Sequence, residues 1–115
     1  MLSQPPRPPG YIYFVEAHGL GLIKIGHAKH DVINRIRELT TGCPVRLELR
    51  SIALGARKDE RNLHRHFRLL RQKGEWFRDH PTLRAMMARH ALPETIYFSS
   101  YGIEPPWYKE IVEGA

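Results

Sequence analysis

Two residues on neighbouring predicted strands have the side chains of a proton-transfer pair. The segment YIYFVEAHGLGLIKIGHA predicts strands over residues 11–17 and 22–26 around a glycine-containing turn. If that turn has two residues, Tyr13 lies directly opposite Lys24 at about 5 Å. Any other even-length turn keeps both side chains on one face of the sheet, but shifts one strand along the other so that the two are no longer directly opposed. Because a nearby cation lowers the pKa of a phenol from its usual value of about 10, Tyr13 is a candidate base. The alternative is a core tyrosine beside a lysine that reaches water from an edge strand.

A predicted helix follows, capped by Asp31 and running to about Thr40. Arg35 and Arg37 lie at opposite edges of its apolar stripe. An arginine at the border of a buried face can reach a site between helix and sheet, where its fork of donors suits a phosphate. The alternative is a pair of solvated charges, which we prefer for Arg37. The stripe itself consists of Val32, Ile33, Ile36 and Leu39.

The next predicted helix, from Lys58 to about Leu70, carries Glu60 and His64 on one face. Leu63 and Phe67 border that face, so the glutamate points towards the core. A buried carboxylate needs a partner, and Mg²⁺ is one that takes only one or two protein carboxylates. The alternative is a glutamate that stabilises the helix N-terminus electrostatically.

Further elements complete a single domain. Residues 47–54 predict a third strand, and Pro81 begins a helix that ends at His90. The order β-β-α-β-α-α predicts an α+β fold with a small, three-stranded, mostly antiparallel sheet flanked by helices. We expect a Pro-rich arm over residues 1–10, the domain over 11–90, and a tail over 91–115 that packs on the domain or is loosely ordered.

The composition favours a nucleic-acid-binding protein, and we expect it in the cytoplasm. The chain has 115 residues, a net charge of +6 and one cysteine, Cys43, which excludes an intramolecular disulfide or a Cys-rich zinc site. From Lys24 to Arg89 there are 16 Lys and Arg against 7 Asp and Glu, whereas the remainder has 2 against 5. A concentrated basic region is typical of proteins with an anionic partner, nucleic acid first, and the alternative is a solvated basic surface. The sequence has neither a membrane-spanning apolar run nor an apolar signal peptide, so we expect no membrane partner.

Taken in order, these residues resemble the GIY-YIG nuclease superfamily. The tripeptide Y-I-Y at residues 11–13 stands at its first signature element, and K-I-G at residues 24–26 stands at its second, followed by polar residues 27–29. Arg35 matches the catalytic arginine of the family, and Glu60 matches its metal-binding glutamate. The blocks R-I-R-E-L-T-T-G-C-P, E-R-N-L-H-R-H-F and G-E-W-F resemble the phage-type branch, which is also grouped under a meiotically up-regulated gene family.

The resemblance covers roughly residues 11 to 87, with two departures from the basic signature. Tyr11 occupies the usual position of the first glycine, and Lys24 replaces the second tyrosine, as it does in some relatives. The structural residues of the signature are then Tyr11, Gly26, Trp76 and Phe77.

The resemblance implies a metal-dependent DNA endonuclease that hydrolyses phosphodiester bonds with one divalent metal, Mg²⁺ or Mn²⁺. Glu60 would hold the metal, Arg35 would stabilise the charge on the phosphate, and Tyr13, helped by Lys24, would orient or deprotonate the attacking water. Second contacts to phosphate, water or metal are expected from His27 and His64, and neutralisation of the nucleic-acid backbone from Lys29, Arg61 and Arg65.

Other readings stay open. A DNA-binding module with the same fold and no catalysis is the alternative that Lys24 favours. RNA is the other possible partner, because Trp107, Tyr108 and Tyr101 could stack on bases, although they could equally pack on the domain. Glu75 could be a second acidic ligand, but we expect it to pair with a local arginine in a structural box. Oligomeric state and target are not encoded in any motif.

Overall fold

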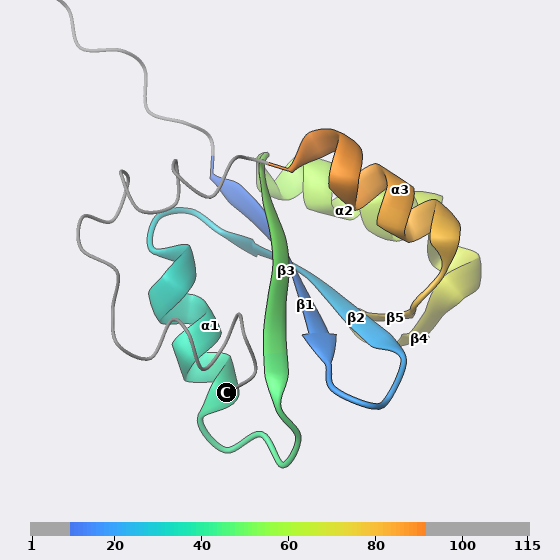
Figure 1. Cartoon of the computed structure of the whole chain (residues 1–115). Coiled ribbons are helices and arrows are strands. Elements are labelled where there is room, and N and C mark those ends of the chain that lie inside the picture. Colours follow the sequence, from blue (N-terminus) through green and yellow to red (C-terminus); the bar gives the residue numbers. More distant parts are fainter. Residues whose placement is uncertain (1–9, 92–115) are drawn as a thin grey trace, which may run out of the picture.

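The computed structural model of the chain describes residues 10–91, so most of the predicted arm and tail, including Trp107, Tyr108 and Tyr101, lies outside the described residues. The described part forms one antiparallel sheet with three α-helices (Figure 1). The elements in chain order are β1 Tyr11–Ala17, β2 Leu22–Ala28, α1 Val32–Thr40, β3 Leu47–Leu54, α2 Arg57–His66, a 3₁₀ helix Arg68–Leu70, β4 Arg71–Lys73, β5 Trp76–Arg78 and α3 Pro81–His90.

The sheet has five strands in the order β3-β1-β2-β5-β4, so the expected three-stranded sheet is wrong in strand number. The two missed strands form a short hairpin that turns at Gly74, whose φ of +57° favours glycine. Each strand has three residues, which is too short for an alternating pattern to be visible. The α+β class and the helical and strand elements predicted before residue 57 are confirmed.

The hairpin of β1 and β2 differs from the two-residue turn considered first. The register pairs Tyr13 with Gly26 and Val15 with Lys24, so the turn is two residues longer. Tyr13 and Lys24 therefore share one face, diagonally rather than directly opposed, as expected for a longer even-length turn.

Helix α1 begins and ends where local chemistry predicts. The Asp31 carboxylate accepts a hydrogen bond from the Asn34 backbone N–H at 3.0 Å, which satisfies one of the free donors at the helix N-terminus. Gly42, with a φ of +83°, follows the C-terminal cap. Helix α2, in contrast, ends at His66 rather than near Leu70, and the 3₁₀ helix replaces its predicted last turn.

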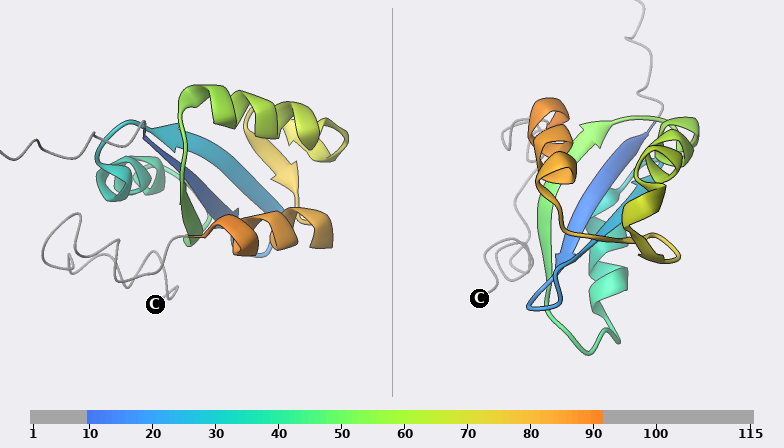
Figure 2. Two further views of the ribbon diagram at one scale, coloured as in Figure 1. Left: turned by 90° about the horizontal axis from the view of Figure 1, so that it is seen from above. Right: turned by 90° about the vertical axis from the view of Figure 1, so that its right-hand side faces the viewer.

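Two apolar clusters lie on opposite faces of the sheet. Helix α1 covers one face, and α2 and α3 cover the other (Figure 1). Figure 2 shows α2 on the β2 side of the second face and α3 on the β3 side. The buried residues of the α1 face are Tyr13, Val15, Ala17, Val32, Ile33, Ile36, Leu47, Leu49 and Ile52. Those of the α2 and α3 face are Ile12, Phe14, Ile23, Ile25, Ala53, Phe67, Phe77, Leu83 and Met87.

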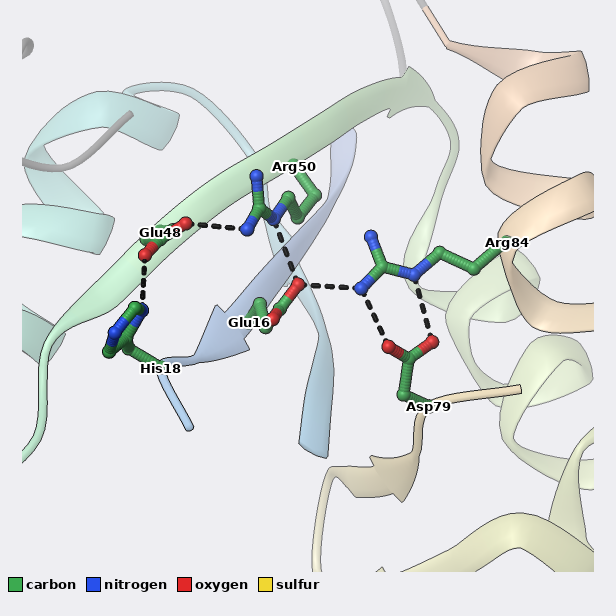
Figure 3. A network of polar contacts seen from close by, with 6 residues as sticks. All are labelled: Glu16, His18, Glu48, Arg50, Asp79 and Arg84. Carbon is green, nitrogen blue, oxygen red and sulfur yellow. Dashed lines mark hydrogen bonds and ion pairs between the residues drawn. The ribbon is translucent and has the colours of Figure 1, made fainter. Parts of the chain in front are cut away.

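A network of charged side chains attaches α3 to the sheet (Figure 3). Glu16 and Glu48 oppose each other on β1 and β3, which is unfavourable unless cations intervene. Arg50, beside a register shift between these strands, bonds both carboxylates. Arg84 of α3 bonds Glu16 at 2.6 Å and forks onto Asp79 at 2.8 and 2.7 Å.

The network holds its acidic groups in the charged form. Burial raises the pKa of Glu16, but hydrogen bonds from Arg84 and Arg50 outweigh burial and lower that pKa overall. The hydrogen bond from Arg84 likewise lowers the pKa of Asp79. Two carboxylates with lowered pKa values stabilise the fold above their unfolded pKa values near 4, and this stabilisation disappears as the pH falls through the folded values.

We therefore predict that Arg84→Gln lowers the free energy of unfolding at pH 7 and weakens its dependence on acidic pH. Because the Arg84 side chain is 39 % exposed, solvent screening limits the loss to about 1 kcal/mol. Urea unfolding at pH 7 and pH 3 measures both effects. Arg89→Gln, an exposed position on the same helix, is the control and should change the free energy by less than ~0.5 kcal/mol. An Arg84→Gln loss of equal size at both pH values would contradict the assignment.

Candidate active site

Tyr13 is buried, and its ring lies across the backbone of β2. Its side chain is on the α1 face, where it directly opposes Gly26. A Cβ atom placed on Gly26 would lie 2.3 Å from Tyr13 Cζ and 2.4 Å from the hydroxyl oxygen, far inside van der Waals contact. The missing side chain at Gly26 thus lets the phenol reach across β2.

Arg35 reaches the same phenol from α1. Its guanidinium is close enough to the Tyr13 phenol to lower the pKa of that hydroxyl, and it lies 3.4 Å from the Glu38 carboxylate, one turn further along the helix. The Arg35 side chain is 51 % exposed, so part of its fork of donors is accessible from solvent. An arginine that acts on a buried phenol and also faces solvent is placed to contact an anion bound beside that phenol.

The outer edge of β2 changes partners at Ile25. β5 pairs with β2 only as far as Lys24. At Ile25 the backbone N–H donates to the Glu75 carbonyl at 3.0 Å, and the carbonyl accepts from His64 Nε2 at 2.9 Å. Because a carbonyl only accepts, His64 must carry its proton on Nε2. Helix α2 is therefore docked against the strand edge just beyond the end of β5.

Lys24 has a carboxylate partner, which answers why a strand of the sheet carries an ammonium. Lys24 Nζ lies 2.8 Å from Glu75 Oε2 and 5.7 Å from the centroid of the Trp76 ring. The Lys24 side chain is only 13 % exposed, so a counter-charge is needed there. The expected pairing of Glu75 with a local arginine is wrong, and so is the direct pairing of Tyr13 with Lys24.

Glu60 is buried on α2, one helical turn before His64. Within residues 10–91 its carboxylate takes part in no hydrogen bond or ion pair. The same range contains no cluster of three or more His, Cys, Asp or Glu side chains that could hold a metal. A single buried carboxylate without a cation fits Mg²⁺ or Mn²⁺ that takes its other ligands from water and phosphate.

The charges of Glu60 and Glu75 both reach the phenol of Tyr13. Burial raises the pKa of Tyr13, the hydrogen bond and charge of Arg35 lower it, and Glu75 and Glu60 raise it again, so the pKa is above 10 overall. Tyr13 is therefore a neutral phenol at neutral pH, and the lowered pKa expected from Lys24 is wrong for the unliganded protein. The three charged groups that act on this hydroxyl, Arg35, Glu60 and Glu75, come from α1, α2 and the β4–β5 turn.

The profile of the T5orf172 domain matches residues 10–94 of the chain. The chain belongs to the T5orf172 domain family. This is a GIY-YIG-like domain of the phage endonuclease type, so the resemblance seen in the sequence is confirmed at the level of the superfamily. A search of curated proteins and a search of solved structures found no match. Among residues 10–91 no helix is long and apolar enough to cross a membrane.

The T5orf172 domain gathers some of the predicted site residues and separates others. Tyr13, Lys24 and Arg35 lie on the α1 side of the sheet, and Glu60 approaches from α2. His27 points to the opposite face from Tyr13, and its two ring nitrogens are buried without a hydrogen-bond partner among the described residues. The remaining predicted contacts, Lys29, Arg61 and Arg65, are exposed, and Tyr11, Trp76 and Phe77 pack against the two apolar clusters.

Sequence reasoning underestimated Glu75, although a signal was present. Glu75 directly precedes Trp76, the residue that pairs with Lys24 in the sheet, and its backbone bonds Ile25. A lysine inside a strand predicts a buried counter-charge, and an acidic residue beside a bulky aromatic one is a reasonable candidate for it. The β4–β5 hairpin had to be recognised before the two could be paired.

We predict that Gly26→Ala lowers the free energy of unfolding by about 1–3 kcal/mol, because the new methyl group displaces the Tyr13 ring. Chemical denaturation of the single variants and of Gly26→Ala combined with Tyr13→Ala measures the effect. The Gly26→Ala cost should shrink sharply in the double variant, where the ring is gone. Equal costs in the two backgrounds would contradict the described contact.

We also predict that the Tyr13 phenol ionises above pH 10 and responds to each of its neighbours. Arg35→Gln should raise its pKa further, whereas Glu75→Gln and Glu60→Gln should lower it. Tyrosine-selective NMR titration, with Tyr13→Phe for assignment, measures the shifts. Since a raised pKa favours the neutral phenol in the folded state, the associated stability is present below pH 10 and is lost above it. A Tyr13 pKa below 10 would overturn this description.

Proposed function

We propose that this T5orf172 domain is a metal-dependent DNA endonuclease of the phage-type branch, which is also grouped under a meiotically up-regulated gene family. The observations that carry the proposal are the carboxylate of Glu60, buried and unpaired within residues 10–91, and the joint effect of Arg35, Glu60 and Glu75 on the pKa of the Tyr13 hydroxyl. The family is of nuclease type, and phosphodiester hydrolysis needs groups of these kinds. A carboxylate can bind a divalent cation, an arginine can bind the phosphate through several N–H donors, and a hydroxyl can position the attacking water.

Each residue has a distinct task in this reaction. Glu60 would hold Mg²⁺ or Mn²⁺, and the metal would supply Lewis-acid stabilisation of the phosphate charge and the departing oxygen. Arg35 binds a non-bridging phosphate oxygen and stabilises its added charge in the transition state. Tyr13 orients the attacking water, and as the phenolate it accepts the proton of that water.

The electrostatics of the site control when Tyr13 can act as a base. The Arg35 charge favours the phenolate, whereas the charges of Glu60 and Glu75 oppose it. A cation held by Glu60 would offset one of the opposing charges and so favour the Tyr13 phenolate. Lys24, held by Glu75, adds a second cation on the same face of the sheet.

The remaining predicted residues have supporting tasks. His64 already holds Ile25 through Nε2, so only its Nδ1 is available for water or phosphate. His27 lies on the α2 side, where a ligand bound near Glu60 could satisfy its ring nitrogens. DNA is the proposed partner and RNA the competitor to test against it, because the basic charge of Lys29, Arg61 and Arg65 suits either backbone.

A nucleic-acid-binding module without catalysis is the second candidate. Its support is specific: Lys24 stands where the signature has a tyrosine, and Glu75 neutralises it. The neutral Tyr13 phenol of the unliganded protein points the same way.

We predict cleavage of supercoiled plasmid and branched DNA with Mg²⁺ or Mn²⁺ and none with EDTA. Glu60→Gln should abolish cutting, and Arg35→Gln should slow it by about 10²–10³-fold, as expected for the loss of one donor to a developing oxyanion. Arg46→Gln, an exposed arginine on the loop before β3, is the matched control and should cut normally.

Three outcomes separate the candidates. Cutting by purified Glu60→Gln protein would refute the metal assignment. Salt-dependent DNA binding without cutting under any metal would favour the binding module. Protection of the plasmid by excess RNA but not by DNA of equal length would change the proposed partner.

A further inference from the structure

Helix α2 carries a group of cations without acidic partners. Arg57, Lys58, Arg61 and Arg65 are all exposed, and within residues 10–91 none of their side chains forms an ion pair. In contrast, four other lysine and arginine side chains in the same range form ion pairs with carboxylates: Lys24, Arg35, Arg50 and Arg84. Among the described residues, further exposed cations without an ion pair are spread over other elements, but α2 carries four of them within nine residues.

The arrangement of these cations does not stabilise the helix. Arg57 and Arg61, and Arg61 and Arg65, are like-charge pairs at i, i+4, and each such pair costs an isolated helix about 0.2–0.5 kcal/mol. Arg57 and Lys58 stand in the first turn, where the helix dipole disfavours cations. Arg65, in the last turn, is the one of the four that the dipole favours. The like-charge pairs and the first-turn cations, which oppose folding, are most simply explained by a function of the folded surface.

The cations occupy the flank of α2 that borders the candidate active site. Successive residues turn by about 100° around a helix, so Arg57 and Arg61 lie next to the side occupied by Glu60 and His64. His64 fixes that side against β2. The other flank faces α3 across a cavity lined by Asp59, Asn62, Leu63 and His66 of α2 and by Met86 and His90 of α3.

The spacing of the cations fits a run of phosphates. From Arg57 to Arg65 the helix rises by about 12 Å. One strand of a duplex places a phosphate at about every 3.4 Å along its axis, so this row spans three or four phosphates. Contacts to phosphates carry no sequence information, and exposed arginines on a rigid helix suit that kind of binding.

We propose that the flank of α2 formed by Arg57, Lys58, Arg61 and Arg65 binds the sugar–phosphate backbone of one nucleic-acid strand, independently of sequence, and leads that strand to Glu60. The inference rests on the proposed function for the position of the scissile phosphate. The binding itself needs neither a metal nor cleavage.

The test measures binding of the full chain to a fluorescently labelled DNA duplex by anisotropy, in EDTA, over a series of salt concentrations. The variant is Arg61→Gln with Arg65→Gln, and its matched control is Arg46→Gln with Arg89→Gln, which removes the same charge from exposed positions off α2. Loss of one phosphate contact lowers the slope of log K against log salt by about 1, so the α2 variant should lose about 2 and the control about 0. Two duplexes of unrelated sequence should lose equally.

The melting temperatures of the same proteins show whether the substitutions act on folding rather than on DNA binding. The α2 variant should melt at the same temperature as the wild type or higher, because two like-charge pairs are relieved. Equal slopes for the α2 variant and its control would overturn the proposal, as would a lowered melting temperature with an unchanged slope. If the wild type cuts DNA while the slopes agree, the proposed function stands and this inference fails. If the slopes differ as expected without cutting under any metal, the inference stands and the proposed function fails.

Discussion

The candidate site depends on the absence of a side chain at Gly26. The Tyr13 ring can cross β2 only because nothing projects from the opposing residue. Burial of that ring in turn places its hydroxyl within reach of Arg35 on one side and of the Glu60 charge on the other. A site assembled from both faces of a sheet thus requires a gap in the strand between them, and glycine provides it.

Some of the elements around Gly26 could be predicted from the sequence with their bounds, whereas others could not. Asp31 and Gly42 mark the ends of α1 by local chemistry, so that helix was predicted with its correct bounds. The register of the first hairpin depends on the length of its turn, which two glycines leave ambiguous. The β4–β5 hairpin depends on pairing with β2, and strands of three residues carry too little pattern to reveal such a contact.

The same division applies to the site. Tyr13, Arg35 and Glu60 could be singled out as candidates because residue type and helical or strand periodicity place them at the border of the core. The partner of Lys24 was missed because an ion pair between β2 and the β4–β5 turn is a property of the sheet order. The direction of the Tyr13 pKa shift could not be predicted from the sequence either, because it depends on the balance between burial and the charges of several different elements.

The exposed edge of β2 has a consequence for how the chain behaves in solution. A strand edge with free backbone groups is a template on which another chain can add a strand. Here β5 covers only the beginning of that edge, and His64 of α2 and the backbone of Glu75 occupy the groups of Ile25 beyond it. The helix that contributes Glu60 therefore also covers part of the edge of β2. Partial unfolding of α2 would uncover the Ile25 carbonyl, so the protection of this strand edge and the candidate site depend on the same helix.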